Sequence, residues 1–209
     1  MGVRLEFFPL PFVVGTIFLV ILLIILWQRK RNWSYLFCFS LFWMYLLFVI
    51  SATAFPIPLP SGAEELQWRL SAAHILSRVN LRLFYFGGLF SLHPNVIFQE
   101  IIGNIIMTIP FGFGLSFVAP IKAKSIAWLA PTIGILIETT QLIIALGIGA
   151  SYRGVDINDV ILNALGVLIG YGLFRIFAWF LLKMTQQSRI NPKGFLAYIR
   201  YIANQTKAN

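Results

Sequence analysis

The sequence predicts an all-α membrane protein, a polytopic bundle of about five transmembrane helices. Hydrophobic residues make up 59% of its 209 residues and charged residues only 11%, and the mean hydropathy is +0.83. Soluble domains carry roughly 25% charged residues, so this chain has too few charges to cover a water-exposed surface. The same composition excludes a disordered chain, and a single cysteine, Cys38, excludes an internal disulfide.

Five windows are long and apolar enough to cross a bilayer, which takes about 20 mostly apolar helical residues. The first basic cluster, Arg29–Arg31, follows the first window. A signal peptide would carry its basic residues before the apolar run, so we interpret the first window as a retained span. The expected spans are about Phe8–Trp27, Trp33–Phe55, Val96–Ala119, Ser125–Leu146 and Asp156–Leu182.

The basic residues predict the orientation. Sixteen Lys and Arg against seven Asp and Glu give a net charge of +9, which in a soluble protein would suggest nucleic acid. In a polytopic protein the positive-inside rule explains such an excess, so we expect no nucleic-acid partner. If Arg29–Arg31 face the cytoplasm, ten Lys and Arg lie on that side and five on the other, with Arg175 inside the last span. The N-terminus is therefore expected outside and the C-terminus in the cytoplasm.

The longest loop, about Ile57–Asn95, is then expected outside, with a short helix lying in the membrane interface. The apolar residues that recur there at helical spacing are Leu66, Leu70, Ala73 and Leu76. The segment after Ser188 mixes apolar and basic residues, which fits either a helix on the anionic inner leaflet or a solvated tail.

Polar residues inside the spans are the main functional signal, because a charge near the bilayer centre costs at least ~2.5–3.5 kcal/mol. The third and fourth spans each carry an acid and an amide at helical spacing, and the fifth opens with two acids and an amide on one face. All of them fall at the same, outer level of the membrane. We therefore predict an outward-opening polar pocket lined by Glu100, Asn104, Glu138, Gln141, Arg153, Asp156, Asp159 and Asn163.

Glu138 is expected to face the bundle interior, where Arg153, Gln141 or Asn163 could meet it. Glu138 and Asp159 are the candidate catalytic residues, although a structural hydrogen-bonded acid at Glu138 is the alternative. Asp156 equally fits a helix N-cap with no further role.

Glycine and proline residues predict how the helices meet. Gly166 and Gly170 form a GxxxG step, which allows close helix approach within the chain or in a homodimer. Pro110 is expected to interrupt the third span and to splay its cytoplasmic end, because proline removes a backbone donor and clashes with the preceding turn.

Several chemistries lack their motifs. The chain has no GxSxG elbow, no P-loop and no Cys/His zinc pattern, and His74 and His93 lack metal-ligand spacing. The acids Glu100, Glu138, Asp156 and Asp159 could together hold Ca²⁺ or Mg²⁺, and a pair of them could act as general acid and base. The sequence alone does not decide between cation binding and acid–base catalysis. A divalent cation is therefore a possible cofactor, and no metal site is assigned.

Four stretches form an ordered combination: Asn80–Phe86, Asn104–Phe113, Ile137–Gln141 and Arg153–Tyr171. Together they resemble the VanZ-like family of bacterial membrane proteins over about Asn80–Tyr171. The family's polar positions correspond here to Asn104, Glu138, Gln141, Arg153, Asp156, Asp159 and Asn163. One departure is Arg82-Leu83-Phe84, where family members usually have a proline before the phenylalanine.

We accordingly divide the chain into residues 1–79 with two spans and the outer loop, a three-span VanZ-like core at 80–182, and a basic cytoplasmic tail at 183–209. The resemblance implies a multi-pass protein of the bacterial cell membrane that is linked to resistance against glycopeptide antibiotics, particularly teicoplanin. These drugs act on lipid-linked cell-wall precursors at the outer leaflet, the side on which the pocket is expected.

Three functions follow as hypotheses. The first is an envelope protein that binds or modifies a lipid-linked wall precursor. The second is an intramembrane enzyme that acts on a lipid head group through carboxylates or a metal. The third is a small transporter or permease subunit, which five spans without repeat symmetry make less favoured unless the chain dimerises through Gly166 and Gly170.

Overall fold

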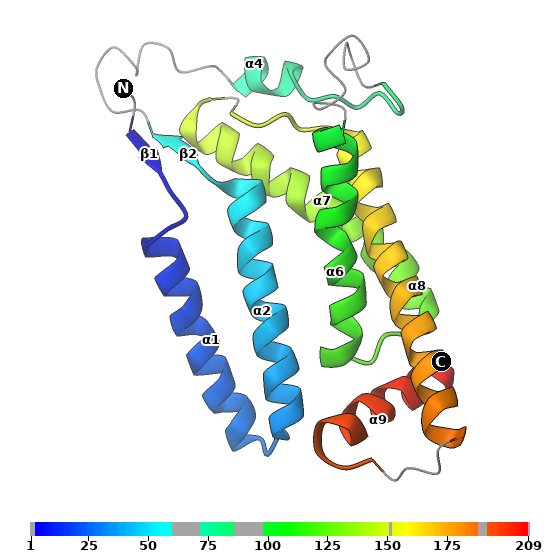
Figure 1. Ribbon diagram of the computed structural model, residues 1–209. Helices are drawn as coiled ribbons and strands as arrows, with labels where there is room; N and C mark the ends of the chain where they lie inside the picture. The colour runs from blue at the N-terminus through cyan, green and yellow to red at the C-terminus, as the bar shows by residue number, and fades with distance from the viewer. Residues whose placement is uncertain (1–2, 60–71, 86–97, 151, 188–191, 209) are drawn as a thin grey trace.

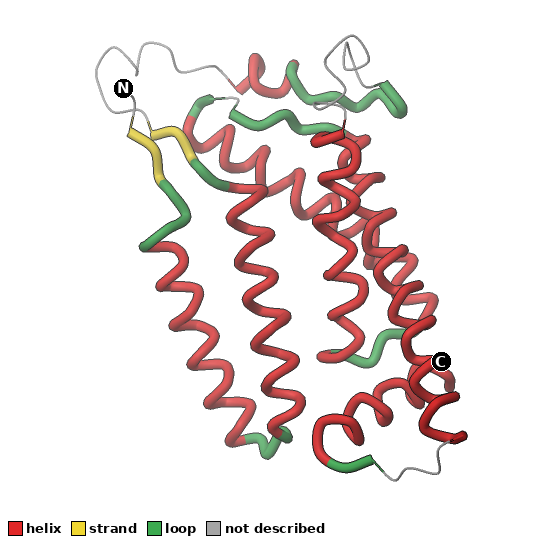
Figure 2. The backbone as a smooth tube through the Cα atoms, viewed as in Figure 1, coloured by secondary structure: helices red, strands yellow, loops and turns green. Residues whose placement is uncertain are grey.

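A computed structural model of the chain describes residues 3–59, 72–85, 98–150, 152–187 and 192–208. The described residues are 79% helical and contain seven α-helices and one short antiparallel strand pair. Five of the helices are long and apolar enough to cross a membrane. Figure 1 shows these five as a bundle with β1, β2 and α4 at one end and α9 at the other, and Figure 2 shows the same elements by type. We call these the β-strand end and the α9 end.

The first two helices form an antiparallel pair at one side of the bundle (Figure 1). Helix α1 spans Leu10–Gln28 and α2 spans Trp33–Ala54, so both lie within two residues of the predicted spans. Asn32 begins α2 as its N-cap, since its side chain accepts a hydrogen bond from the Tyr35 N–H at 2.8 Å. The chain before α1 forms β1 (Val3–Leu5), which pairs with β2 (Ile57–Leu59) after α2. Two such short segments, far apart in the chain, carry no sequence pattern that predicts their pairing.

Helix α6 spans Gly103–Val118 and follows the π-helical turn η2 (Phe98–Ile102). The prediction that Pro110 interrupts this span is wrong, because α6 is continuous through it. Membrane helices tolerate proline within a span. In the same stretch α6 is joined to α2, where the Tyr45 hydroxyl donates to the Met107 carbonyl at 2.7 Å.

Helices α7 (Ala123–Ile148) and α8 (Ile157–Gln187) complete the bundle. Gly149 ends α7 in the left-handed conformation, with φ of 71°. Three small residues hold α6 and α8 close together: a Cβ at Gly112, Gly166 or Gly170 would overlap the backbone of the opposite helix. Gly166 and Gly170 are thus occupied by α6 of the same chain. A homodimer through them stays a prediction, and it would compete with this packing.

The predicted interfacial helix of the outer loop is described only in part. Helix α4 spans Ala72–Ser77, whereas Leu66 and Leu70 lie outside the described residues. Ile75 is its buried residue, and Leu76 is exposed. Beyond α4, Asn80 pairs with Asp156 in an isolated parallel bridge, which fixes the segment 80–85 over the start of α8.

The C-terminal segment is a helix packed on the bundle rather than a freely solvated tail. Helix α9 spans Gly194–Ala208, and its Ala203 packs with Phe174, Ala178 and Leu182 of α8. The Tyr198 hydroxyl donates to the Phe117 carbonyl near the end of α6. Burial raises the pKa of this tyrosine well above its ordinary value, so the hydroxyl keeps its proton and acts as a donor.

Candidate functional site

A polar cavity of about 450 Å³ opens at the β-strand end, between α2, α6, α7 and the start of α8. Seven of the eight residues that sequence analysis assigned to a pocket line it, and Asn163 does not. The polar lining residues are Thr53, Glu100, Asn104, Glu138, Gln141, Arg153, Asp156 and Asp159. The structure therefore brings residues from four separate stretches of the chain to one place.

Close packing of α6 on α8 sets one wall of the cavity. Thr108 and Asn163 lie just below it, where the buried Thr108 hydroxyl donates to the Asn163 carbonyl at 2.8 Å. One helical turn nearer the β-strand end, the Asn104 side chain of α6 donates to the Glu100 carbonyl at 3.0 Å, and Asp159 of α8 lines the same cavity. Close approach of the two helices at the glycines deeper in the pair brings these polar side chains into one cavity.

Glu138 is the most deeply placed acid of the cavity and is 6% exposed. Its carboxylate accepts a hydrogen bond from the backbone N–H of Asp156 at 2.9 Å. This N–H belongs to the first residue before α8, so the acid of one helix contacts the N-terminal end of another. Negative charge is stabilised at a helix N-terminus, which gives Glu138 a structural partner as well as a face on the cavity.

The expected partners of Glu138 are directed elsewhere. Gln141 donates from its side chain to the Thr53 carbonyl at 3.1 Å, and Arg153 donates to the Phe55 carbonyl at 2.6 Å. The Tyr152 hydroxyl donates to the intervening carbonyl of Ala54 at 3.2 Å.

These three contacts satisfy consecutive carbonyls at the C-terminal end of α2, a position where backbone acceptors lack intrahelical donors. Burial raises the pKa of Tyr152, against the opposing effect of the nearby Arg153 charge, so its hydroxyl remains a donor. The loop between α7 and α8 is thereby fixed to the end of α2, and this closes the cavity on the α2 side.

Asp156 is the N-cap of α8, as one of the two sequence interpretations proposed. Its carboxylate accepts from the Asn158 N–H at 2.8 Å and, through its other oxygen, from the Asn80 side chain at 2.8 Å. The role is not purely structural, however, because Asp156 also lines the cavity.

Asn158 is the main residue that sequence reasoning missed. It is 2% exposed, its amide oxygen accepts from the Phe84 N–H at 2.6 Å, and its amide nitrogen donates to the carbonyls of Arg82 and Tyr85. Asn80 donates to the same Tyr85 carbonyl at 2.9 Å. Asn158 lies in a polar run with two acids, but helical spacing alone placed it away from the cavity and gave no sign of the segment that it holds.

Asn163 is fully buried below the cavity, between α6 and α8. Within the described part of the chain, its amide oxygen and nitrogen have no hydrogen-bond partner. Its backbone carbonyl accepts the Thr108 hydroxyl, so the position contributes to the helix contact that supports the cavity.

The cavity is predominantly acidic, with four carboxyl groups and one guanidinium group in its lining. The carboxyl groups of Glu100, Glu138, Asp156 and Asp159 all line this one cavity, so acidic side chains are concentrated there. Among the described residues, no three Asp, Glu, His or Cys side chains come together in a group that could hold one metal ion. The lining can therefore accept hydrogen bonds from hydroxyl, amide and ammonium groups, while Arg153 offers a single site for an anion.

A family model described as VanZ/LLP1 matches residues 42–178. The match extends from within α2 to within α8 and so includes every polar residue that lines the cavity. No curated protein and no solved structure matches the chain.

Proposed function

Because the chain belongs to the VanZ-like family of membrane proteins linked to glycopeptide resistance, we propose that its cavity binds the head group of a lipid-linked cell-wall precursor. The observation that carries the proposal is the convergence of Glu138, Asp159 and Arg153 on one cavity at a single end of the bundle. Binding at the outer face would compete with teicoplanin for the same precursor and so lower the effect of the drug.

The chemistry of the lining supports this class of ligand. Sugars and peptides present hydroxyl, amide and ammonium donors, and the acids and amides of the cavity are acceptors for them. The position of the cavity between α2 and α6, within the apolar bundle, suits a ligand that is itself anchored in the membrane.

Teicoplanin susceptibility tests the proposal. A sensitive Gram-positive host is made to express the wild type, Glu138→Gln or Asp159→Asn, with membrane abundance matched by blot. We expect the wild type to raise the inhibitory concentration and each variant to lose at least half of that rise, since each removes a charged acceptor from the cavity.

Glu6→Gln provides the matched control. It makes the same chemical change at an exposed acid next to β1, outside the cavity, and should retain full resistance. Equal loss in all three variants, or no rise with abundant wild type, would sink the proposal.

A second candidate, an intramembrane enzyme, is favoured by the presence of Glu138 and Asp159 in the lining of the same cavity. Two carboxyls from facing helices are the groups that general acid and base catalysis on a lipid head group needs. Lipid extracts of the same strains distinguish the two functions. A new lipid species in the wild type that is absent from both variants would indicate the enzyme, and unchanged lipids in a resistant strain would indicate binding alone.

A further inference from the structure

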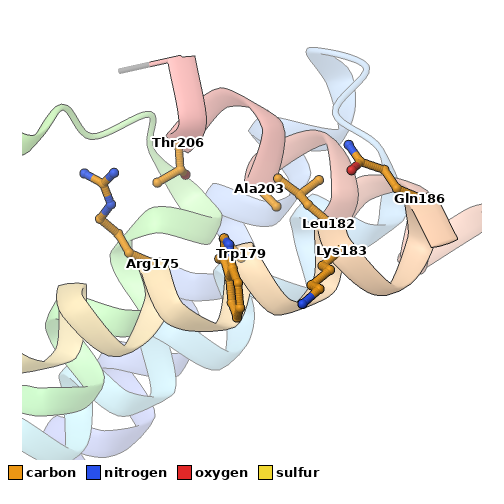
Figure 3. A pocket seen from close by; sticks show the side chains of 8 residues that line it. Arg175, Trp179, Leu182, Lys183, Gln186, Ala203 and Thr206 are labelled. Atoms are coloured by element: carbon orange, nitrogen blue, oxygen red, sulfur yellow. The ribbon is translucent and has the colours of Figure 1, made fainter.

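A second cavity lies at the opposite end of the protein, between α8 and α9. It has a volume of about 250 Å³ and is lined on the α8 side by Arg175, Trp179, Lys183 and Gln186 and on the α9 side by Ala203 and Thr206. Figure 3 shows these side chains around the crossing of the two helices, with the Arg175 guanidinium rising from α8 toward the end of α9 that carries Thr206. Arg175 and Lys183 are exposed, whereas Thr206 is only 9% exposed.

Among the described residues, no acidic side chain pairs with either cation of this cavity. The sequence contains seven acidic residues, and none follows Asp159. Asp159 precedes Arg175 by 16 positions on the same helix, which is about 24 Å along the axis. Within the described part of the chain, Arg175 and Lys183 are therefore not neutralised by an acidic side chain, and an anion from outside can bind them.

Counted along α8 from its first residue, the cavity lies about one bilayer thickness away. Arg175 is 18 residues from the start of α8, or about 27 Å along its axis, and Lys183 is about 39 Å away. The hydrocarbon core of a bilayer is about 30 Å thick, so the two cations lie near and beyond its far edge. Trp179 lies between them, is 56% exposed and has the Lys183 ammonium 5.2 Å from its ring centroid. Tryptophan at this level is typical of the interface between acyl chains and head groups.

We propose that the cavity between α8 and α9 binds the phosphate of an anionic membrane phospholipid. Arg175 and Lys183 contact the phosphate oxygens, Gln186 and Thr206 offer further hydrogen bonds, and the exposed apolar residues of α8 beside them contact the acyl chains. Because α9 supplies one wall, the bound lipid also joins α9 to the bundle.

Lipid binding by the purified full chain tests the proposal. Native mass spectrometry in detergent gives the apparent dissociation constant of the first phosphatidylglycerol bound, with phosphatidylcholine of the same acyl chains for comparison. We expect the double variant Arg175→Gln/Lys183→Gln to bind phosphatidylglycerol on the order of tenfold more weakly, because each basic residue near an anionic surface contributes substantially to lipid affinity.

The control variant is Lys122→Gln/Lys124→Gln, which removes two exposed charges beside the start of α7, outside the cavity. It should bind phosphatidylglycerol as the wild type does, and Arg175→Lys should largely retain binding because it keeps the charge. Equal weakening in the two double variants would indicate a diffuse charge effect and overturn the site.

Inorganic phosphate added to the wild type distinguishes the lipid from a soluble anion. Phosphate at millimolar concentration should leave phosphatidylglycerol bound, because it lacks the acyl chains that contact α8. Displacement by phosphate alone would reassign the cavity to a soluble anion and overturn the proposal.

Discussion

At the scale of single residues, Asn158 shows how a buried amide can organise a segment far from it in sequence. Its oxygen and nitrogen together hold the backbone of residues 82–85 over the start of α8. The side chain is nearly fully buried. If the amide were removed, each of these backbone groups would lose its hydrogen-bond partner, and bulk water could not readily replace it.

We therefore expect Asn158→Ala to lower the stability of the folded protein by about 1–3 kcal/mol, the cost of leaving a buried polar group unpaired. Thermal unfolding in detergent measures the loss, and hydrogen exchange should rise in residues 80–85 first. Asn204→Ala on the exposed face of α9 is the control and should change neither. An Asn158→Ala protein with unchanged exchange in residues 80–85 would contradict this role.

At the scale of elements, the contact of α6 with α8 depends on glycines that allow backbone approach. A side chain at Gly170 would overlap the Ile109 carbonyl and the Phe113 backbone, whereas one at Gly172, two residues on, has open space around it. The same helix pair carries Asn104 and Asp159 toward the cavity, so its spacing sets the geometry of the site.

Gly170→Leu should accordingly reduce the yield of monodisperse protein and destabilise it by several kcal/mol, since neither backbone can move aside without loss of packing. Gly172→Leu should be tolerated. Gel filtration and thermal unfolding of the two variants give the comparison, and equal behaviour would show that close approach at Gly170 is not required.

The membrane-spanning helices were the part of the fold that could be predicted from the sequence. A helix that crosses a bilayer needs a long apolar run, and this requirement does not depend on which helices pack beside it. The five spans were expected within a few residues of their observed bounds at most ends, although α8 continues to Gln187, beyond the predicted Leu182. The strand pair β1–β2 was not predictable, since it joins two three-residue segments more than 50 positions apart. The effect of Pro110 was not predictable from the sequence, since membrane helices can continue through a proline and α6 does so.

The candidate site was predictable to the extent that its residues are costly in a membrane. Glu138, Asp159 and Asn104 stood out for that reason, and all three line the cavity. Their partners did not follow from spacing: Gln141 and Arg153 donate to backbone carbonyls at the end of α2, which carry no sequence signal of their own. Helical periodicity predicted that Asn163 lies on the same face of the helix as Asp156 and Asp159. Asn163 lies one turn deeper than Asp159, however, and does not line the cavity.

At the scale of the whole molecule, the charges are divided between the two ends. The acids that line the cavity lie at the β-strand end, and no acidic residue follows Asp159 in the sequence. The basic loop after α1 and the basic residues that flank α9 lie at the other end (Figure 1). This distribution predicts that the α9 end faces the cytoplasm.

Cysteine labelling tests that orientation. In a Cys38→Ala background, Ser77→Cys places a thiol on exposed α4 and Lys193→Cys places one just before α9. In intact cells a membrane-impermeant thiol reagent should label Ser77→Cys and not Lys193→Cys, and permeabilised cells should label both. The reverse pattern would put the acidic cavity in the cytoplasm and exclude competition with teicoplanin at the cell surface.

The contacts at the end of α2 also impose an order on biogenesis. The carbonyls of Thr53, Ala54 and Phe55 receive donors that lie 88 to 98 positions later in the chain. At about 5–20 residues per second, a ribosome needs about 5–20 s to make that stretch. During this interval the carbonyls at the end of α2 can accept hydrogen bonds only from water or lipid head groups. The end of α2 therefore stays at the membrane surface until the later donors are made. The cavity therefore closes late in synthesis, when the loop after α7 emerges and reaches back to a helix inserted long before.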